Sequence, residues 1–392
     1  MMEMTRTFHP VGQGAFYSEH FRSENGDDFR IVYDCGTKTS KKKVDPVKVI
    51  QGAFNDSKPI DILFISHFDE DHISMISELL NQHAIIKLVV LPLLPVEETA
   101  VLQAHYRHEG NTIGELLLAD PVGFFHNKAA VLRVESTGNE PIELSQNHDE
   151  EYRDIPHDSD VVILKPDGEL VDAKPGDWKD IPSGAQIFVP RHPWCYIPHN
   201  YEYPQRHQAL LNELDKRADI DQARLVDISY ITSKLKGLNE VYRSLEAAQC
   251  GNINENSMLV YSGPSRCPLG ITHGWSGLIL DSRKFNCWFG DRSACIYSGD
   301  SDFETVKIHE VYKSLWKNVG TVQIPHHGSE GSFSAGFLGK GGSVYICPIS
   351  ARRHNKHHPA PCVLKEILIR HSLPLIVNEC PCSKLSQHIL VS

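Results

Sequence analysis

A dense group of candidate metal ligands lies between residues 65 and 73, in the string Ile-Ser-His-Phe-Asp-Glu-Asp-His-Ile. His67, Asp69, Asp71 and His72 fall within six residues, directly after an apolar run that is typical of a strand buried on both faces. Side chains at such a strand-to-helix turn spread from a rigid edge and can converge on one point. Imidazole together with carboxylate suits zinc, manganese or iron. Acidic residues at a helix N-terminus also favour the helix dipole. That alternative leaves the two histidines unexplained, so the string predicts a metal site.

Further candidate ligands follow later strand-like runs. Asp300 follows the run 294–298, His326 and His327 follow 321–324, and His358 comes after 343–349. In layered α/β folds, strand ends along one edge form the site. Taken singly, an aspartate after a strand is an ordinary turn former or helix cap, and adjacent histidines are often a surface pair. Their recurrence in this order predicts that they join the first group.

Alternating and continuous apolar patterns define the elements that must position these residues. They predict strands over the following residues of the two ends of the chain: 6–11, 15–21, 29–35, 61–66, 86–94, 257–262, 276–281, 294–298, 321–324 and 343–349. Helices are predicted directly after His72 and over 303–316 and 359–371. Strands that alternate with helices indicate a layered α/β fold.

The middle of the chain is less regular. A helical stretch over 205–236, broken once, is expected to stop at Gly237. We expect one domain over residues 1–392, with residues 95–253 inserted into it. Such an insertion would shape access to the site and offer surface to a protein partner. The oligomeric state is left open.

Composition restricts the class of protein. A net charge of −11 argues against a protein that coats nucleic acid, but not against a nuclease, because a metal centre supplies positive charge locally. No apolar stretch is long enough to span a membrane, and the N-terminus lacks the apolar core of a signal peptide. The ten cysteines form no Cys-x-x-Cys pair, which argues against a structural zinc knot. These features predict a cytoplasmic protein with free thiols.

The ordered motifs resemble the metallo-β-lactamase superfamily, whose pattern is His-x-His-x-Asp-His followed by a later histidine, an aspartate and a final histidine. Asp69 stands where that pattern has its second histidine, a variant similar to the hydrolase domain of ComEC-type competence proteins. Several short strings resemble that branch in the same order: Val-Gly-Gln-Gly at 11–14, Asp-Cys-Gly at 34–36, Asn-Ser at 256–257, Ser-Gly-Asp at 298–300, Pro-His-His-Gly-Ser at 325–329, and His-Pro at 358–359 preceded by Ser350. The resemblance covers about 1–94 and 254–380, and not the middle.

The resemblance implies a four-layer αβ/βα sandwich with two divalent metal ions, zinc or manganese, at the sheet edge. The implied metal-site positions are His67, Asp69, Asp71, His72, Asp300 and one of His326 or His327. Asp69 makes the site richer in oxygen, which shifts the expectation towards manganese. The superfamily's intermediate histidine has no assigned counterpart, and ComEC-like domains resemble this chain in that respect. Its candidates are His105, His108, His126, His148, His192 and His273. No channel is present in the sequence, so only the hydrolase part of the resemblance applies.

The expected reaction is hydrolysis of a phosphodiester, most of all in DNA, by a metal-activated hydroxide. Asp69 and Asp71 would act at the metals, and His358 would contact a phosphate oxygen or protonate the leaving group. Basic residues near the motifs would bind flanking phosphates, although a solvated basic loop explains them equally well in the first cluster. The expected substrate-binding residues are Ser329, Arg352, Arg353 and Lys356, together with a first cluster of Lys38, Lys41, Lys42 and Lys43.

Two other classes of function fit the same motifs. The first is a hydrolase of a small phosphodiester, thioester or lactone, in which the middle segment covers a small pocket. The second is a binding protein with a vestigial metal site. The near-complete ligand set argues against the second, because loss of function usually begins with the ligands.

Overall fold

The computed structural model describes residues 2–24, 26, 28–142, 161–189, 194–247, 256–264, 271–276, 292–339 and 343–391. Two nine-stranded sheets form its centre. The first sheet contains, in spatial order, β13 (Ile271–Ser276), β18 (Leu385–Val391), β1 (Met2–Phe8), β2 (Phe16–Ser23), β3 (Asp28–Cys35), β4 (Ile60–Phe64), β5 (Ile86–Pro92), β6 (Ala130–Val134) and β9 (Trp178–Ile181). The second contains β17 (Leu373–Val377), β16 (Ile346–Ser350), β15 (Val319–Val322), β14 (Ala294–Tyr297), β12 (Leu259–Pro264), β11 (Trp194–Tyr201), β10 (Gln186–Val189) and β8 (Val162–Leu164), with β7 (Ser136–Thr137) beside β11.

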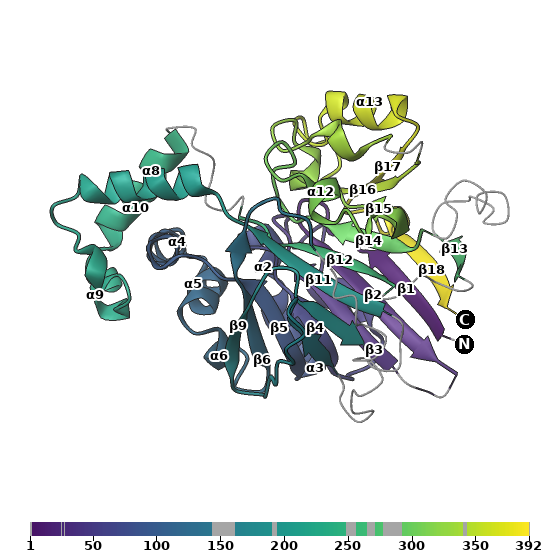
Figure 1. Ribbon diagram of the computed structural model, residues 1–392, viewed down its shortest axis with the longest axis horizontal. Coiled ribbons are helices and arrows are strands. Elements are labelled where there is room, and N and C mark those ends of the chain that lie inside the picture. The colour runs from purple at the N-terminus through teal and green to yellow at the C-terminus, as the bar shows by residue number, and fades with distance from the viewer. Residues whose placement is uncertain are drawn as a thin grey trace.

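Strand direction divides each sheet into an antiparallel and a parallel part. In the first sheet, the neighbouring strands β18, β1, β2 and β3 pair antiparallel. The neighbouring strands β3, β4, β5, β6 and β9 pair parallel. In the second sheet β14, β15, β16 and β17 run parallel. The pairing of β1 with β18 brings the two ends of the chain side by side (Figure 1). Parallel strands end at the same edge of a sheet, and the candidate ligands follow these strands.

Helices cover the outer face of each sheet (Figure 1). Their bounds are α1 (Pro46–Ala53), α2 (Glu70–Ile73), α3 (Ile76–His83), α4 (Val96–Glu109), α5 (Thr112–Ala119), α6 (Pro121–Phe124), α8 (Pro204–Asp215), α9 (Ile228–Ser233), α10 (Leu235–Ala247), α12 (Ile308–Val311) and α13 (Pro361–Ile369).

Three apolar clusters show the order of the layers. In β4, Ile62 and Phe64 join the cluster between the two sheets, while Leu63 and Ile65 join the cluster under the helices of the first sheet. This alternation follows from the two-residue period of a strand, and it explains why residues 62–65 form a continuous apolar run. A third cluster places Val363 of α13 against the outer face of the second sheet. The layers therefore run helix, sheet, sheet, helix, which confirms the predicted αβ/βα sandwich.

The middle of the chain contributes to both sheets. Residues 95–253 supply β6 and β9 to the first sheet and β7, β8, β10 and β11 to the second. The same segment supplies the helices α4 to α6 and α8 to α10, of which α8, α9 and α10 extend outward on one side (Figure 1). The segment therefore completes the sandwich as well as adding helices to it.

Three secondary-structure expectations need correction or lie outside the described residues. The helix predicted over 303–316 is wrong for most of its length, because only α12 is helical there. The Asp302 side chain accepts hydrogen bonds from Glu304 N and Thr305 Oγ1, which favours a turn over a helix.

Gly237 lies inside α10 instead of ending a helix, since the buried face of Leu238, Val241, Tyr242 and Leu245 outweighs a glycine cost of about 1 kcal/mol. Of the strand predicted over 276–281, residues 277–281 lie outside the described ranges. Across the described residues, no helix combines the length and the apolar character needed to cross a membrane.

Candidate metal centre

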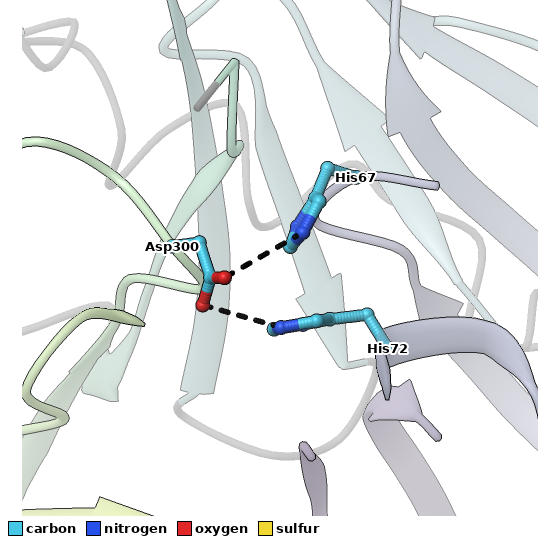
Figure 2. A group of neighbouring side chains, drawn as sticks. All are labelled: His67, His72 and Asp300. Carbon is cyan, nitrogen blue, oxygen red and sulfur yellow. Dashed lines mark ion pairs between the residues drawn. The ribbon is translucent and has the colours of Figure 1, made fainter. Parts of the chain in front are cut away.

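The ends of strands from both sheets bring the clustered side chains together. His67 and Asp69 follow β4 of the first sheet. Asp71 and His72 lie in the short helix α2, which comes directly after them. Asp300 follows β14 of the second sheet. Figure 2 shows Asp300 reaching towards the imidazoles of His67 and His72 from the opposite side. Residues more than two hundred positions apart therefore meet where the two sheets face each other.

Two glycines permit the close approach of the segments that carry these side chains. A Cβ atom on Gly36 would lie 2.5 Å from the carbonyl carbon of His72, and one on Gly299 would lie 2.6 Å from Ser66 Oγ. Gly299 also has φ +52°, a left-handed conformation that glycine adopts at little cost. Larger residues at either position would push the two sides of the site apart.

The ligand atoms form two overlapping groups. His67, His72 and Asp300 make one, Asp71, His72 and His327 make the other, and within each group the ligand atoms lie within 4.8 Å of one another. The Asp300 carboxylate lies between the histidines, with Oδ1 3.2 Å from His72 Nε2 and Oδ2 3.9 Å from His67 Nε2. His327 Nε2 lies 3.0 Å from Asp71 Oδ2. All five residues are buried.

Asp69 lies at the outer rim of the cluster. Its Oδ2 atom is 4.0 Å from His67 Nε2, and its side chain is 20% exposed. Tyr106 of α4 donates a hydrogen bond of 3.1 Å to Asp69 Oδ1 and so orients the carboxylate. Sequence analysis missed this tyrosine, because no motif or spacing linked α4 to the site.

Each imidazole is held through its Nδ1 atom. His72 Nδ1 lies 2.7 Å from Asp34 Oδ2, and His327 Nδ1 donates to the Ser350 carbonyl at 2.8 Å. His67 Nδ1 lies 2.9 Å from the hydroxyls of both Ser66 and Ser257. A proton held at Nδ1 leaves the lone pair of Nε2 available to bind a metal ion. Hydrogen bonding through Nδ1 is therefore the arrangement found around metal-binding histidines.

Asp34 connects two of these histidines. Besides His72, its carboxylate accepts hydrogen bonds from the backbone N and the hydroxyl of Ser66, both at 2.7 Å. The Ser66 hydrogen is thus committed to Asp34, so the Ser66 oxygen is an acceptor for His67 Nδ1–H. Asp34, Ser66 and Ser257 were identified in the sequence only as parts of motifs, and their positioning roles come from the structure.

Two unpartnered nitrogen atoms test whether a cation fits here. His67 Nε2 and His72 Nε2 are buried, and neither makes a hydrogen bond to any described residue. A buried polar atom without a partner costs about 1–3 kcal/mol. A cation at the centre of each group would satisfy both nitrogens, and the mixture of imidazole and carboxylate suits zinc or manganese. The residues present therefore fit a divalent metal.

The carboxylates favour positive charge at this place. Burial acts to raise the pKa of Asp300, but His72 and His326 beside it hold that pKa well below its usual range. Burial also acts against ionisation of Asp71, yet the hydrogen bond from His327 and the charge of His72 lower its pKa. Burial lowers the pKa of His67 to about 3, with His72 adding to the effect, so this ring is neutral at pH 7. His67 is therefore in the neutral form that metal binding requires. Burial acts to lower the pKa values of His72 and His327, but neighbouring carboxylates raise both, so a metal bound by these two rings would displace a proton.

Lys38 already places a cation on two of these carboxylates. Its Nζ atom lies 2.8 Å from Asp71 Oδ1 and 3.9 Å from Asp69 Oδ2, although its side chain is 45% exposed. Burial acts to lower the pKa of Lys38, but Asp71 and Asp69 raise it above its usual value. The position attracts positive charge, as the donor set predicts.

Two comparisons with known proteins found a similarity. Residues 24–182 match the family model described as the Metallo-beta-lactamase superfamily. The match covers 159 of the 392 residues of the chain. No curated protein matches the sequence. Among solved structures, the chain is similar to the crystal structure of a long form RNase Z from yeast, at 9% identity and a TM-score of 0.34, over 99% of this chain and 42% of that one. The chain therefore spans less than half the length of that protein.

The matched range holds part of the candidate ligand cluster. It includes His67 to His72, whereas Asp300 and His327 lie beyond it. The structure brings these later residues to the matched part, so the cluster depends on both ends of the chain. None of the described intermediate-histidine candidates, His105, His108 and His126, belongs to either ligand group. His148 and His192 lie outside the described residues, as does the side chain of His273.

The two adjacent histidines differ in their relation to the candidate ligand cluster. His327 is 4% exposed and belongs to a ligand group. His326 is 37% exposed, its Nε2 lies 3.9 Å from Asp300 Oδ2, and its Nδ1 lies 3.0 Å from Ser332 Oγ. Both have left-handed backbones, with φ +47° and +56°, a costly conformation that clusters at functional sites. The geometry favours His327 as the ligand.

His358 and the expected phosphate-binding residues lie further out. The His358 ring stacks on His326 at 5.9 Å and lies 6.4 Å from His327. Arg352, Arg353 and Lys356 are exposed, and their side chains make no hydrogen bond or ion pair with any described residue. Their loop is held through Arg353 N, which donates to Glu379 Oε2 at 2.7 Å. Ser329, directly after the two histidines, is partly exposed.

Proposed function

We propose that this protein is a metal-dependent phosphodiesterase of the ComEC-like branch that hydrolyses nucleic acid, most of all DNA. The observation that carries the proposal is the pair of overlapping ligand groups, which share His72 and have Asp300 between them. Such a pair of groups suits two metal ions that clamp one phosphate.

The residues divide between the two ions as follows. His67 and Asp69 would hold one ion, and Asp71, His72 and His327 would hold the other, with one oxygen of Asp300 directed to each side. When bound, two zinc or manganese ions lower the pKa of a water molecule and neutralise charge that develops on a phosphoryl oxygen. The protein contributes rigidity, because Asp34, Ser66, Ser257 and Ser350 fix the rings. His358, whose ring stacks on that of His326, would contact a phosphate oxygen.

A nucleic-acid substrate is supported by cations around the cluster. Lys38 lies on the ligand carboxylates, and Arg352, Arg353 and Lys356 are exposed with their charges unpaired among the described residues. Such groups bind flanking phosphates without reading sequence. Ser329 is included as a substrate-binding residue because it directly follows His326 and His327.

The experiment measures metal content and hydrolysis together. Purified protein is loaded with zinc or manganese, analysed for metal, and assayed on bis(p-nitrophenyl) phosphate and on end-labelled single- and double-stranded DNA. We expect Asp71→Asn and Asp300→Asn to lose at least about 100-fold in turnover, because each removes a ligand charge. Asp172→Asn, which changes an exposed aspartate that pairs with Lys174, is the matched control. Full activity in both site variants, or a protein that binds no metal, would contradict the proposal.

One observation favours a second candidate, a hydrolase of a small phosphodiester. A cleft of about 860 Å³ adjoins Asp69 and is covered by α4 and α5 of the middle segment. Its volume lies within the range of small-molecule sites. Competition separates the two candidates, because DNA inhibits hydrolysis of bis(p-nitrophenyl) phosphate only where DNA occupies the same site.

A further inference from the structure

The cleft beside the metal cluster joins two different kinds of surface. Asp69 and Lys38 lie at its inner end, next to the candidate ligands. One wall is the loop after β3, at residues 37–41, and the other wall comes from α4, the start of α5, and α10. The cleft is thus continuous with the place where a scissile phosphate would lie.

The loop wall suits phosphate groups. Five consecutive residues, Thr-Lys-Thr-Ser-Lys at 37–41, line the cleft with hydroxyls and two ammonium groups. The loop is held in place because Thr37 N donates to Ser74 Oγ at 2.9 Å and Thr39 Oγ1 accepts from Gln13 N at 3.0 Å. Lys41 is exposed and forms no ion pair with any residue in the described ranges. Its charge is available to a ligand in the cleft.

The helix wall suits a flat aromatic group. The rings of His105 and Tyr242 stack at a centroid distance of 3.7 Å and an angle of 14°, and both residues line the cleft. Tyr106 lines it as well and ties the wall to Asp69. The acidic residue Glu109 on this wall lies 3.6 Å from Arg243, which offsets its charge. Tyr242 is buried behind His105, whereas the His105 ring is partly exposed to the cleft. A partly exposed aromatic ring opposite ammonium groups offers a stacking face for a base of single-stranded nucleic acid.

We infer that this cleft binds the nucleotide next to the scissile phosphate, with Lys38 and Lys41 at its phosphates and the partly exposed His105 ring at its base. The inference rests on the proposed phosphodiesterase function and adds a substrate class to it. The helix wall is built from the middle segment, so this segment determines which substrate reaches the metals. The ligand is a nucleoside phosphate, supplied either by a single strand or by a free nucleotide.

The test measures binding without turnover. An Asp71→Asn background keeps the strand intact, and fluorescence anisotropy follows a labelled single-stranded 12-mer of thymidylate in the presence of manganese. We expect Lys41→Ala and His105→Ala each to weaken binding about tenfold, since one removes a phosphate contact and the other removes stacking. Lys48→Ala on α1 and His108→Ala on α4 are matched controls, because both residues are exposed and lie outside the cleft lining. The controls should stay within about twofold of the background.

The outcomes separate this inference from the proposed function. Unchanged binding in both cleft variants, or equal losses in cleft and control variants, overturns the inference. If the protein hydrolyses bis(p-nitrophenyl) phosphate but the cleft variants bind the strand with unchanged affinity, the proposed function stands and the inference about the cleft is wrong. If the cleft variants lose strand affinity but the protein hydrolyses no phosphodiester, the inference about the cleft stands and the proposed function is wrong. Competition by thymidine monophosphate at equal concentration assigns the site to free nucleotides, and weaker competition assigns it to strands.

Discussion

The Asp34 carboxylate lies 2.7 Å from His72 Nδ1 and also accepts two hydrogen bonds from Ser66, so one buried side chain fixes both sides of the first ligand group. Asp34 is the penultimate residue of β3, whereas His72 lies in α2, nearly forty residues later. The relationship is a positioning one, because Asp34 is a member of neither ligand group.

Asp34→Asn is expected to weaken metal affinity about 10- to 100-fold while the fold is kept. Asparagine has the same shape and tolerates the left-handed backbone at this position, where φ is +53°, so the change removes mainly the negative charge. Chelator competition with zinc measures the affinity. Unchanged affinity would show that the charge of Asp34 has no part in holding His72.

His327→Ala and His326→Ala are expected to separate the roles of the adjacent histidines. Loss of His327 removes a buried group 3.0 Å from Asp71, so we expect about one metal ion fewer for each chain. Loss of His326, which is partly exposed, should leave the metal content unchanged. Elemental analysis of the two dialysed proteins checks this, and the reverse result would exchange their assignments.

Lys38→Met is expected to destabilise the metal-free protein and to affect the metal-loaded protein less. Without metal, Lys38 offsets repulsion between Asp69 and Asp71, and its partial exposure limits this contribution to about 1 kcal/mol. Urea unfolding in the presence of a chelator and in the presence of manganese gives the two values. Equal losses under both conditions would mean that lysine and metal do not share these carboxylates.

His199→Leu is expected to reduce the sensitivity of the fold to acid. His199 is fully buried in β11, its ring nitrogens make no hydrogen bond to the described residues, and burial lowers its pKa to about 4. Because this folded-state pKa lies below the ordinary 6.5, the unfolded chain binds the extra proton between these values. Stability is therefore fully present above pH 6.5 and falls as the pH drops towards 4, by about 3 kcal/mol for this one group. Urea unfolding at pH 7.5 and pH 4.5 should show a smaller difference for His199→Leu than for the wild type, with exposed His108→Leu as the control.

Arg6→Leu is expected to cost about 3–5 kcal/mol of stability. The Arg6 guanidinium and the Glu19 carboxylate are both buried, 2.6 Å apart, and Glu19 also accepts from Ser262 and Tyr297 of the second sheet. Removing the cation leaves a buried charge without its partner. The double variant Arg6→Leu/Glu19→Leu should recover part of the loss. A double variant less stable than Arg6→Leu would show that the hydroxyl contacts of Glu19 outweigh the ion pair.

The sequence by itself determined the layered fold and the residues that carry chemistry. Buried parallel strands are apolar on both faces, so β4, β14 and β15 stand out as continuous runs, and polar residues directly after them are easily recognised. Residues 67–72 are consecutive in the chain, directly after an apolar run, so the sequence alone predicts that they form the turn between a strand and a helix. Candidate ligands can be predicted from the local sequence pattern where they directly follow the end of a strand in the chain.

Only the tertiary structure decided which neighbours complete the site. The sequence left His326 and His327 equivalent, and their difference in burial follows from packing against Ser332 and Ser350. Nothing in the sequence indicates that Tyr106 of α4 contacts Asp69, or that His105 of α4 stacks on Tyr242 of α10, because each contact joins residues that are far apart in the chain. Contacts of this kind depend on how layers pack, and no short-range spacing encodes them.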